Sequence, residues 1–246
     1  NHTVKKAQHV EIITLAHGNC SNKLHRQAMY HHHINRHMPK HFYQLMLVTE
    51  VTKQDSYITF IEKILPFGIT AVQLRWKDAN YKTIYNLGTA LKPLLRRHNI
   101  PLIVNDSLKL ASDLDADGLH LGQADGDIIT ARNALGSKKI IGLSVSSVDE
   151  SLVANALPLD YVGTGAVFPT NSKRDATIIG LNTLQSIVKH SRNKVIAIGG
   201  INESNITDTL STGINGVAII SAIHHAHDPC HTTHSLSTSI TSHQSI

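Results

Sequence analysis

The sequence predicts an α/β protein that folds as a (β/α)8 TIM barrel. Two observations carry this prediction: short apolar runs rich in β-branched residues alternate with segments of helical spacing from Leu45 onward, and there are eight such runs. Alternating strands and helices are typical of a parallel sheet that is buried on both faces. Eight units fit a closed barrel better than an open doubly wound sheet, which usually has about five or six strands.

The predicted strands are short and largely apolar. In chain order they are Leu45–Thr49, Thr70–Leu74, Leu102–Val104, Gly118–Leu121, Ile140–Leu143, Tyr161–Gly163, Val195–Ile198 and Val217–Ile220. The segments between them show helical spacing, as at Ile84, Leu87 and Leu91. Pro93 lies in this helical pattern and is expected to kink or shorten the helix. No Gly-x-Gly-x-x-Gly motif follows the first strand, which argues against a dinucleotide-binding sheet.

The two ends of the chain differ in composition from the middle. Residues 1–44 carry six basic residues and one acidic residue, whereas the remainder has 17 of each. The basic charge therefore belongs to a His-rich N-terminal extension, and the predicted barrel, residues 45–226, has no basic excess with which to bind nucleic acid. The Ser/Thr/His-rich tail, residues 227–246, has no periodic apolar face. Both extensions are predicted to be disordered or weakly ordered.

Histidine clusters at these ends suggest a second interpretation. The run His31-His32-His33 and the group of His227, Cys230 and His231 have the side chains that bind soft or borderline metals. Their spacing matches no closed four-ligand site, and a solvated tail is the alternative.

Cysteine usage and hydropathy bear on the compartment and the partners. No run of about 18 apolar residues occurs, which excludes a membrane-spanning helix. The two cysteines, Cys20 and Cys230, lie near opposite ends, which excludes a disulfide scaffold and predicts a reducing, cytoplasmic setting. The sequence does not decide between a monomer and a homo-oligomer.

Polar and glycine residues gather where the predicted strands end. They are Gln73, Arg75 and Lys77 after the second strand, Asn105 and Asp106 after the third, Gln123 and Asp125 after the fourth, Ser144 after the fifth, Thr170, Asn171, Ser172 and Lys173 after the sixth, Gly199 and Gly200 after the seventh, and Ser221 after the eighth. The carboxyl ends of barrel strands share one face, where the active site usually lies. We therefore expect these residues to meet at one mouth.

Two pairs of charged residues stand out in this set. Arg75 and Lys77 are two residues apart, so on an extended segment they point the same way and can hold one anion; a surface pair that forms salt bridges is the alternative. Asp106 and Asp125 follow adjacent strands and suit Mg²⁺ held together with substrate phosphates. Helix N-capping is the alternative for these acids. We favour the metal site because the basic pair is expected across the same mouth.

Two later loops suggest a phosphate site. Lys173 lies in a Ser/Thr-rich loop, a composition typical of closing segments that bring a cation to a phosphate. Gly199 and Gly200 precede a helix expected to open at Ile201-Asn202, where backbone N–H groups and the positive helix terminus would bind phosphate.

Nucleophilic catalysis is not expected. His120 alternates with apolar residues and is expected to be structural, pointing either into or out of the barrel wall. Ser144 has no evident base partner in the sequence. Residue chemistry alone therefore predicts two anion sites, one of them metal-assisted, for joining or transferring phosphorylated small molecules.

Seven motifs in order resemble those of thiamine phosphate synthases. They are Gln73-Leu-Arg75-Trp-Lys77-Asp, Val104-Asn105-Asp106, Ala116-Asp-Gly-Leu-His-Leu-Gly-Gln123 with Asp125, Gly142-Leu-Ser144, Pro169-Thr-Asn-Ser-Lys173, Ala197-Ile-Gly-Gly-Ile201 and Ile220-Ser221-Ala222-Ile223. The resemblance spans Leu45 to Ile223 and omits the His-rich ends. It implies a transferase of thiamine biosynthesis that joins hydroxymethylpyrimidine diphosphate to hydroxyethylthiazole phosphate, giving thiamine phosphate and pyrophosphate with the help of Mg²⁺.

The resemblance also implies a role for each matching residue. The pyrimidine diphosphate would be held by Gln73, Arg75, Lys77, Asn105, Ser144 and Lys173, of which Arg75, Lys77 and Lys173 would be catalytic; Mg²⁺ by Asp106 and Asp125; and the thiazole phosphate by Thr170, Asn171, Ser172, Gly200, Ile220 and Ser221. In this family the pyrophosphate is thought to leave first, and the thiazole nitrogen then captures the pyrimidinylmethyl cation. No general base is needed for that capture.

One departure and two alternatives accompany the resemblance. Trp76 stands where the family usually has Glu, and a residue between two inward-pointing neighbours is expected to face outward. A related thiazole tautomerase shares the barrel but has no diphosphate to bind, so Arg75, Lys77 and Asp106 count against it. The other alternative is a non-catalytic metal-binding protein that works through its His-rich ends.

Overall fold

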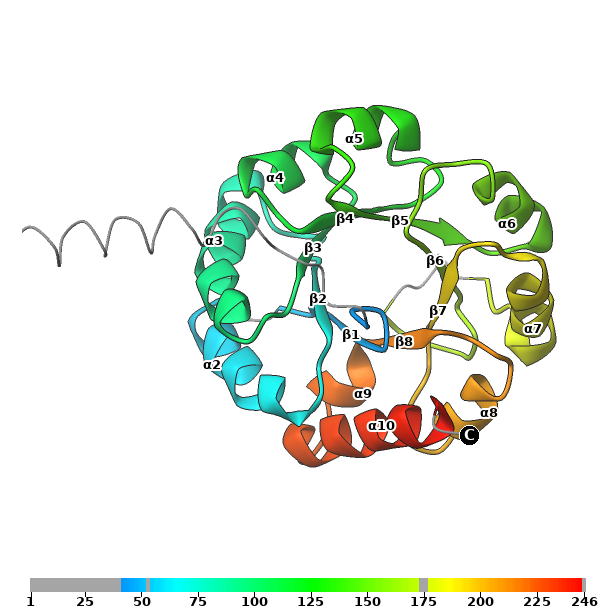
Figure 1. Cartoon of the computed structure of the whole chain (residues 1–246). Helices are drawn as coiled ribbons and strands as arrows, with labels where there is room; N and C mark the ends of the chain where they lie inside the picture. The colour runs from blue at the N-terminus through cyan, green and yellow to red at the C-terminus, as the bar shows by residue number, and fades with distance from the viewer. Residues whose placement is uncertain (1–40, 52–53, 173–176, 245–246) are drawn as a thin grey trace, which may run out of the picture. The chain divides into compact units, whose positions relative to one another are not determined.

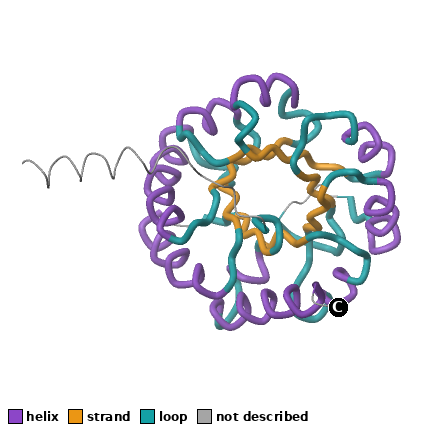
Figure 2. The backbone as a smooth tube through the Cα atoms, viewed as in Figure 1, coloured by secondary structure: helices purple, strands orange, loops and turns teal. Residues whose placement is uncertain are grey.

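A closed parallel barrel forms the centre of the molecule. The computed structural model describes residues 41–51, 54–172 and 177–244. Eight strands of these residues pair in sequence order, and β8 pairs back with β1 (Figure 2). The strands are β1 (Leu45–Val48), β2 (Ala71–Leu74), β3 (Leu102–Asn105), β4 (Gly118–Leu121), β5 (Ile140–Val145), β6 (Tyr161–Thr164), β7 (Lys194–Ile198) and β8 (Gly216–Ile219). The predicted (β/α)8 barrel is confirmed, with strand ends displaced by one or two residues.

Helices surround the barrel on the outside (Figure 1). They are α2 (Gln54–Ile64), the 3₁₀ turn η1 (Leu65–Phe67), α3 (Tyr81–Arg97), α4 (Leu108–Asp113), α5 (Ile128–Leu135), α6 (Val148–Ala154), α7 (Gly180–His190), α8 (Ile206–Leu210), α9 (Ser221–His224) and α10 (Pro229–Gln244). Short polar residues begin several of them: the side chains of Asn80, Ser107, Asp127 and Ser147 accept backbone N–H bonds as the N-caps of α3 to α6. Among the described helices, none has the length and apolarity to cross a membrane.

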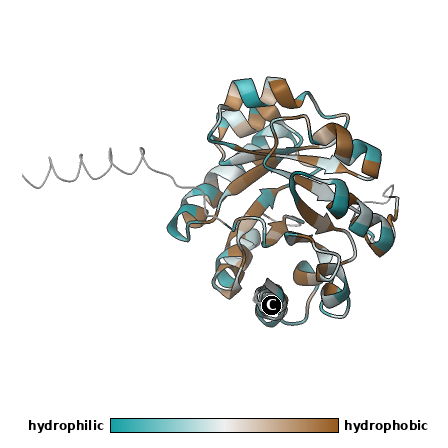
Figure 3. Ribbon diagram, turned by 45° about the vertical axis from the view of Figure 1, so that its right-hand side comes forward, coloured by the Kyte–Doolittle hydropathy of each residue, from teal (hydrophilic) through white to brown (hydrophobic). Residues whose placement is uncertain are grey.

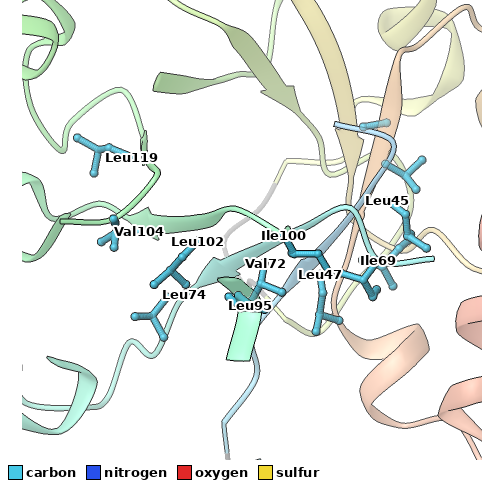
Figure 4. Packing of buried hydrophobic residues seen from close by; sticks show 14 of the residues in the cluster. Leu45, Leu47, Ile69, Val72, Leu74, Leu95, Ile100, Leu102, Val104 and Leu119 are labelled. Atoms are coloured by element: carbon cyan, nitrogen blue, oxygen red, sulfur yellow. The ribbon is translucent and has the colours of Figure 1, made fainter. Parts of the chain in front are cut away.

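Strand side chains alternate between two buried regions. Leu45 and Leu47 on β1, Val72 and Leu74 on β2, and Leu102 and Val104 on β3 belong to the cluster packed between strands and helices (Figure 4). The alternate residues, such as Met46 and Ile103, are equally buried but lie outside that cluster, so they point into the barrel. Figure 3 shows the apolar strands enclosed by helices of mixed hydropathy. Gln73, Asn105, His120 and Ser144 share this inward register.

Pro93 does not shorten its helix, so of the two predicted effects, a kink or a shorter helix, the second is wrong. Helix α3 continues past Pro93 to Arg97, and Leu94 and Leu95 in its last turn are buried. Pro93 itself is exposed, so the carbonyl that loses its helical partner lies on the solvent side, where water can bind it. The apolar contacts of the last turn would be lost if the helix ended early.

The C-terminal tail is ordered, which corrects the prediction of a disordered or weakly ordered segment. Residues 229–244 form α10, which contacts α8, α9, α2, η1 and β1. Its inner face consists of Thr232, Thr233, Leu236 and Ile240, all buried. The Thr233 hydroxyl donates to the Pro229 carbonyl at 2.6 Å, so this polar group is satisfied within the helix. The hydroxyl-rich face therefore packs like an apolar one, which a hydrophobicity pattern does not reveal.

Some predictions concern residues outside the described part of the chain. The N-terminal extension up to residue 40, including the run His31-His32-His33 and Cys20, falls there, as does Lys173. Among the described residues no group of three or more His, Cys, Asp or Glu side chains is placed to hold a metal ion, so His227, Cys230 and His231 do not form the suggested site.

Candidate active site

Arg75, just after β2, is hydrogen-bonded to residues that follow β1 and β6. Thr49, a buried residue directly after β1, donates its hydroxyl to the Arg75 carbonyl at 2.7 Å and accepts the Arg75 backbone N–H at 2.8 Å. These bonds fix the backbone just beyond β2. The Arg75 guanidinium then donates to the carbonyl of Ser172 at 3.5 Å. The loops after β2 and β6 therefore lie side by side at the carboxyl end of the barrel, as expected for one mouth.

Asp106 and Asp125 lie together at the same mouth. Their carboxyl groups are hydrogen-bonded to each other, and the Gly122 N–H donates to Asp125 Oδ2 at 2.8 Å. Burial, followed by the bond to Asp125 and its charge, raises the pKa of Asp106 to about 6. The charges of Lys77 and Arg75 act in the opposite direction, which places both cations close to the acid pair. The structure thus brings together the two charged pairs that the sequence singled out.

Neither acid caps a helix. The N-cap of α4 is Ser107, and the N-cap of α5 is Asp127. Asp106 instead adopts a left-handed conformation with φ of 65° and donates its backbone N–H to the His120 carbonyl at 2.8 Å. The N-capping alternative is therefore wrong for both residues, and their carboxyl groups are left to face the mouth.

A pocket lies at the ends of β6, β7 and β8. Its lining consists of Thr170, Ser172, Gly199, Gly200, Ile201, Ala218, Ile219, Ile220 and Ser221. Five of the six residues predicted to hold the thiazole phosphate are in this lining. The sixth, Asn171, is exposed and does not line the pocket. The pocket is small, and its lining includes two glycines and three hydroxyl side chains, groups that suit a phosphate.

Gly200 is held by asparagine side chains rather than by a helix. The amide groups of Asn202 and Asn205 donate to the Gly200 carbonyl at 3.3 and 3.0 Å. The helix predicted to open at Ile201-Asn202 begins only at Ile206. Asn205 Oδ1 accepts the Asn202 backbone N–H at 2.8 Å, and this local bond keeps the segment in a loop. Gly200 has φ of 69°, and a Cβ there would lie 2.6 Å from the Pro169 carbonyl oxygen, so only glycine fits.

His120 and Tyr161 line the interior beneath the mouth, and neither was predicted as a site residue. His120 points into the barrel, with Nε2 2.9 Å from Ser144 Oγ and Nδ1 2.8 Å from the Tyr161 hydroxyl. Burial lowers the pKa of His120 to about 4, so its ring is neutral. Ser144 therefore does have an imidazole partner, contrary to the sequence-based interpretation. The inward register of His120 with Asn105 and Gly142 was the signal in the sequence that could have revealed it.

The other residues singled out in the sequence, Gln73, Asn105, Gln123 and Trp76, lie at different positions around the barrel. Gln73 is buried and donates to Met46 Sδ at 3.6 Å, and Asn105 ends β3 in the inward register. The Gln123 side chain donates to the Ser144 carbonyl at 2.7 Å and so steadies the end of β5. Trp76 packs against the outer apolar cluster, in agreement with its expected outward direction.

A family model described as thiamine monophosphate synthase matches residues 45–223, which include every described residue of this mouth. The chain belongs to this family. The thiamine-phosphate synthase of Chlamydia abortus is 43% identical over 202 residues, which cover 81% of this chain and 95% of that protein. The thiamine-phosphate synthase of Persephonella marina is 47% identical over 163 residues, covering 66% and 78% of the two chains. The predicted function, thiamine phosphate synthase, and its class, transferase, are confirmed.

Solved structures agree with this assignment. A thiamine phosphate pyrophosphorylase from Pyrococcus furiosus superposes with a TM-score of 0.75 at 35% identity, covering 82% of this chain and 98% of that one. A 3-hexulose-6-phosphate synthase from Salmonella typhimurium has a TM-score of 0.64 at 17% identity, covering 81% and 99%. At 17% identity, the likeness to the 3-hexulose-6-phosphate synthase shows the barrel fold alone. The function of this member of the thiamine monophosphate synthase family is supported instead by the family model and by the more similar relatives.

Proposed function

We propose that this mouth joins hydroxymethylpyrimidine diphosphate to hydroxyethylthiazole phosphate, releasing pyrophosphate and thiamine phosphate. The observation that carries the proposal is the meeting of two unlike anion sites. One combines Arg75 and Lys77 with the paired carboxyl groups of Asp106 and Asp125, and the other is the pocket around Gly200 with its three hydroxyl side chains. A diphosphate and a monophosphate would each find a suitable site at the carboxyl end of one barrel.

Mg²⁺ fits the acid pair. The two carboxyl groups are hydrogen-bonded to each other, and burial, followed by this bond and the charge of Asp125, disfavours ionisation of Asp106 without a cation. Mg²⁺ commonly takes one or two protein carboxylates and completes its octahedral shell with substrate phosphates and water. Asp106 and Asp125 would hold the ion, which would supply positive charge to the diphosphate as it leaves.

The bond-breaking step separates the pyrimidine methylene carbon from the diphosphate oxygen, and the electron pair departs with the diphosphate. Arg75 and Lys77 would stabilise that developing charge, together with Lys173 from the loop beyond Ser172. Gln73, Asn105 and Ser144 would hold the pyrimidine portion and the diphosphate in place. Because Thr49 fixes the Arg75 backbone, its guanidinium is oriented before the substrate arrives.

The bond-forming step uses the lone pair of the thiazole nitrogen, which attacks the methylene carbon of the cation. No proton has to be removed to make this nitrogen nucleophilic. The phosphate pocket, with Thr170, Ser172, Ile220 and Ser221 beside Gly200, would anchor the thiazole so that its nitrogen faces the carbon. Exposed Asn171 would contribute only once substrate is bound.

The test is to mix both substrates with Mg²⁺ and the full chain, and to measure pyrophosphate release together with thiamine phosphate formation. We expect the two products in equal amounts. Folded protein that releases no pyrophosphate, yet interconverts thiazole phosphate tautomers, would overturn the proposal in favour of a tautomerase.

A further inference from the structure

A chain of three polar side chains lies in the barrel interior beneath the mouth. The hydroxyl of Tyr161 on β6 lies 2.8 Å from His120 Nδ1 on β4, and His120 Nε2 lies 2.9 Å from Ser144 Oγ on β5. One end of this chain, Ser144, belongs to the proposed pyrimidine diphosphate site. The other two residues, His120 and Tyr161, have no assigned role.

Gly142 makes room for His120 and Tyr161. In the barrel register Gly142 stands between His120 and Tyr161, whose rings stack with centroids 5.3 Å apart. A Cβ on Gly142 would lie 2.2 Å from Tyr161 Cζ and 2.6 Å from His120 Nδ1. The missing side chain therefore allows the imidazole and the phenol to meet across a strand that would otherwise separate them.

The hydrogen bonds of this chain have one consistent direction. Tyr161 is 1% exposed, and within the described part of the chain the acceptor found for its hydroxyl is His120 Nδ1. The phenol therefore donates its proton to Nδ1, because the opposite direction would leave a buried O–H group unpaired. A neutral imidazole that accepts at Nδ1 carries its proton on Nε2, so it donates to Ser144 Oγ.

We propose that His120 and Tyr161 are positioning residues that fix Ser144 as a hydrogen-bond donor to the pyrimidine diphosphate. This inference rests on the proposed function of the mouth. With Nε2–H already donated to Oγ, the Ser144 proton points away from His120 and toward the bound ligand. Diphosphate oxygens only accept hydrogen bonds, so a serine set as a donor matches them.

The opposite direction would have a different chemical consequence. If His120 carried its proton on Nδ1, Nε2 would accept the Ser144 proton, and Oγ would present only lone pairs to the ligand. Such a serine would repel a diphosphate oxygen and would be prepared to act as a nucleophile. The direction set by the buried Tyr161 hydroxyl therefore explains how a serine beside a histidine can bind substrate rather than attack it.

The first test reads the tautomer directly. Ring ¹H–¹⁵N correlation spectra of the full chain would be recorded without substrate, and the His120 signals would be assigned by their loss in His120→Gln. We expect a neutral ring protonated on Nε2, and we expect Tyr161→Phe to weaken this preference. A ring protonated on Nδ1 in the unchanged protein would overturn the proposal.

The second test compares binding of the two substrates by calorimetry. Tyr161→Phe should raise the Kd of the pyrimidine diphosphate about fivefold, the effect expected when one hydrogen bond is lost, and leave the Kd of the thiazole phosphate within about twofold. His120→Leu should weaken the diphosphate further, and His120→Gln, which can still donate to Ser144, should recover part of the loss. Tyr85→Phe, on the outer helix α3, is the matched control.

Ser144→Ala separates failure of this inference from failure of the proposed function. If Ser144→Ala leaves diphosphate binding unchanged, Ser144 is not a ligand of this substrate and the site assignment is wrong. If Ser144→Ala weakens binding but Tyr161→Phe and His120→Leu do not, the site assignment stands and the positioning role is wrong. Two other results would also contradict the positioning role and indicate a purely structural one: equal weakening of the binding of both substrates by Tyr161→Phe, or no recovery of diphosphate binding in His120→Gln.

Discussion

The carboxyl groups of Asp106 and Asp125 are hydrogen-bonded to each other, although each lies in the loop after a different strand. Two carboxyl groups in contact repel when both are ionised, so such a pair keeps a proton or binds a cation. Arg75 and Lys77 lie near enough to offset part of this repulsion. The arrangement leaves one position between the acids where a proton and a divalent ion would compete.

Replacing Asp106 with asparagine tests this competition. Asp106→Asn removes one charge and one of the two proposed metal ligands, so we expect Mg²⁺-dependent turnover to fall by about a hundredfold or more. Thiazole phosphate binding, measured by calorimetry, should stay within about twofold because the Gly200 pocket is untouched. Asp149→Asn, an exposed acid on α6, is the control. Unchanged Mg²⁺ dependence in Asp106→Asn would contradict the metal assignment.

Asn205 offers a test of the phosphate loop. Asn205→Ala removes the 3.0 Å bond to the Gly200 carbonyl and the acceptor for the Asn202 N–H. The loop would lose its fixed orientation, and we expect the KM for the thiazole phosphate to rise about fivefold, corresponding to about 1 kcal/mol. The KM for the pyrimidine diphosphate should not change. Asn182→Ala on α7 is the control, and an equal rise for both substrates would indicate a general loss of structure.

Acid sensitivity is expected from His224 on α9. Its ring stacks on Tyr57 and on Phe60, its Nδ1 donates to the Ile220 carbonyl at 2.8 Å, and its Nε2 accepts from the Tyr57 hydroxyl. Burial lowers the pKa of His224 below its ordinary value, although the nearby Glu50 carboxylate acts in the opposite direction and His225 adds to the lowering.

The sign of the pH effect follows from this shift. A histidine with a lowered pKa in the folded state contributes fully to stability above its unfolded pKa of about 6.5, and this contribution is lost as the pH falls below that value. The free energy of unfolding of His224→Gln should therefore fall less on acidification than that of the unchanged protein. Denaturant titrations between pH 8 and 5 measure the difference, and parallel curves for the two proteins would refute it.

Helix α10 should contribute to stability through its inner face. Leu236→Ala removes a fully buried side chain, so we expect the free energy of unfolding to fall by about 2–5 kcal/mol. Thr238→Ala, on the exposed face of the same helix, should change it by no more than about 0.5 kcal/mol. Similar values for the two variants would mean that α10 adds little to the packing.

The barrel was predictable from the sequence because its strands are buried on both sides and therefore read as apolar runs. The meeting of the acidic pair, Asp106 and Asp125, with the basic pair, Arg75 and Lys77, was predictable for a related reason. The carboxyl ends of the strands in a parallel barrel converge, whatever their separation along the chain. Other features depend on contacts that no local pattern records. His120 has room for its direction because Gly142 has no side chain; Gly142 lies directly opposite His120 on the neighbouring strand but 22 residues away in sequence.

Helix assignments failed where side-chain hydrogen bonds outweighed propensity. The loop after Gly200 reads as a helix start, but the amide groups of Asn202 and Asn205 satisfy its backbone locally. The tail has a polar composition, but the two buried threonine hydroxyls of α10 are satisfied: Thr233 donates to the Pro229 carbonyl and Thr232 to the Glu203 carboxylate. In both places composition does not predict the secondary structure, because polar side chains that could hydrogen-bond to water form hydrogen bonds within the protein instead.

Helix α10 lies beyond residue 223, where the match to the family ends, yet it is the outer element that covers β1 next to α2, α8 and α9. The last helix of the outer layer, α10, is thus a Ser/Thr/His-rich segment, unlike the apolar strands that it packs against. Shortening the chain to its family-matched segment would uncover the seam between the first and last strands. Any minimal catalytic version of this enzyme must therefore retain these sixteen residues or supply another amphipathic segment in their place.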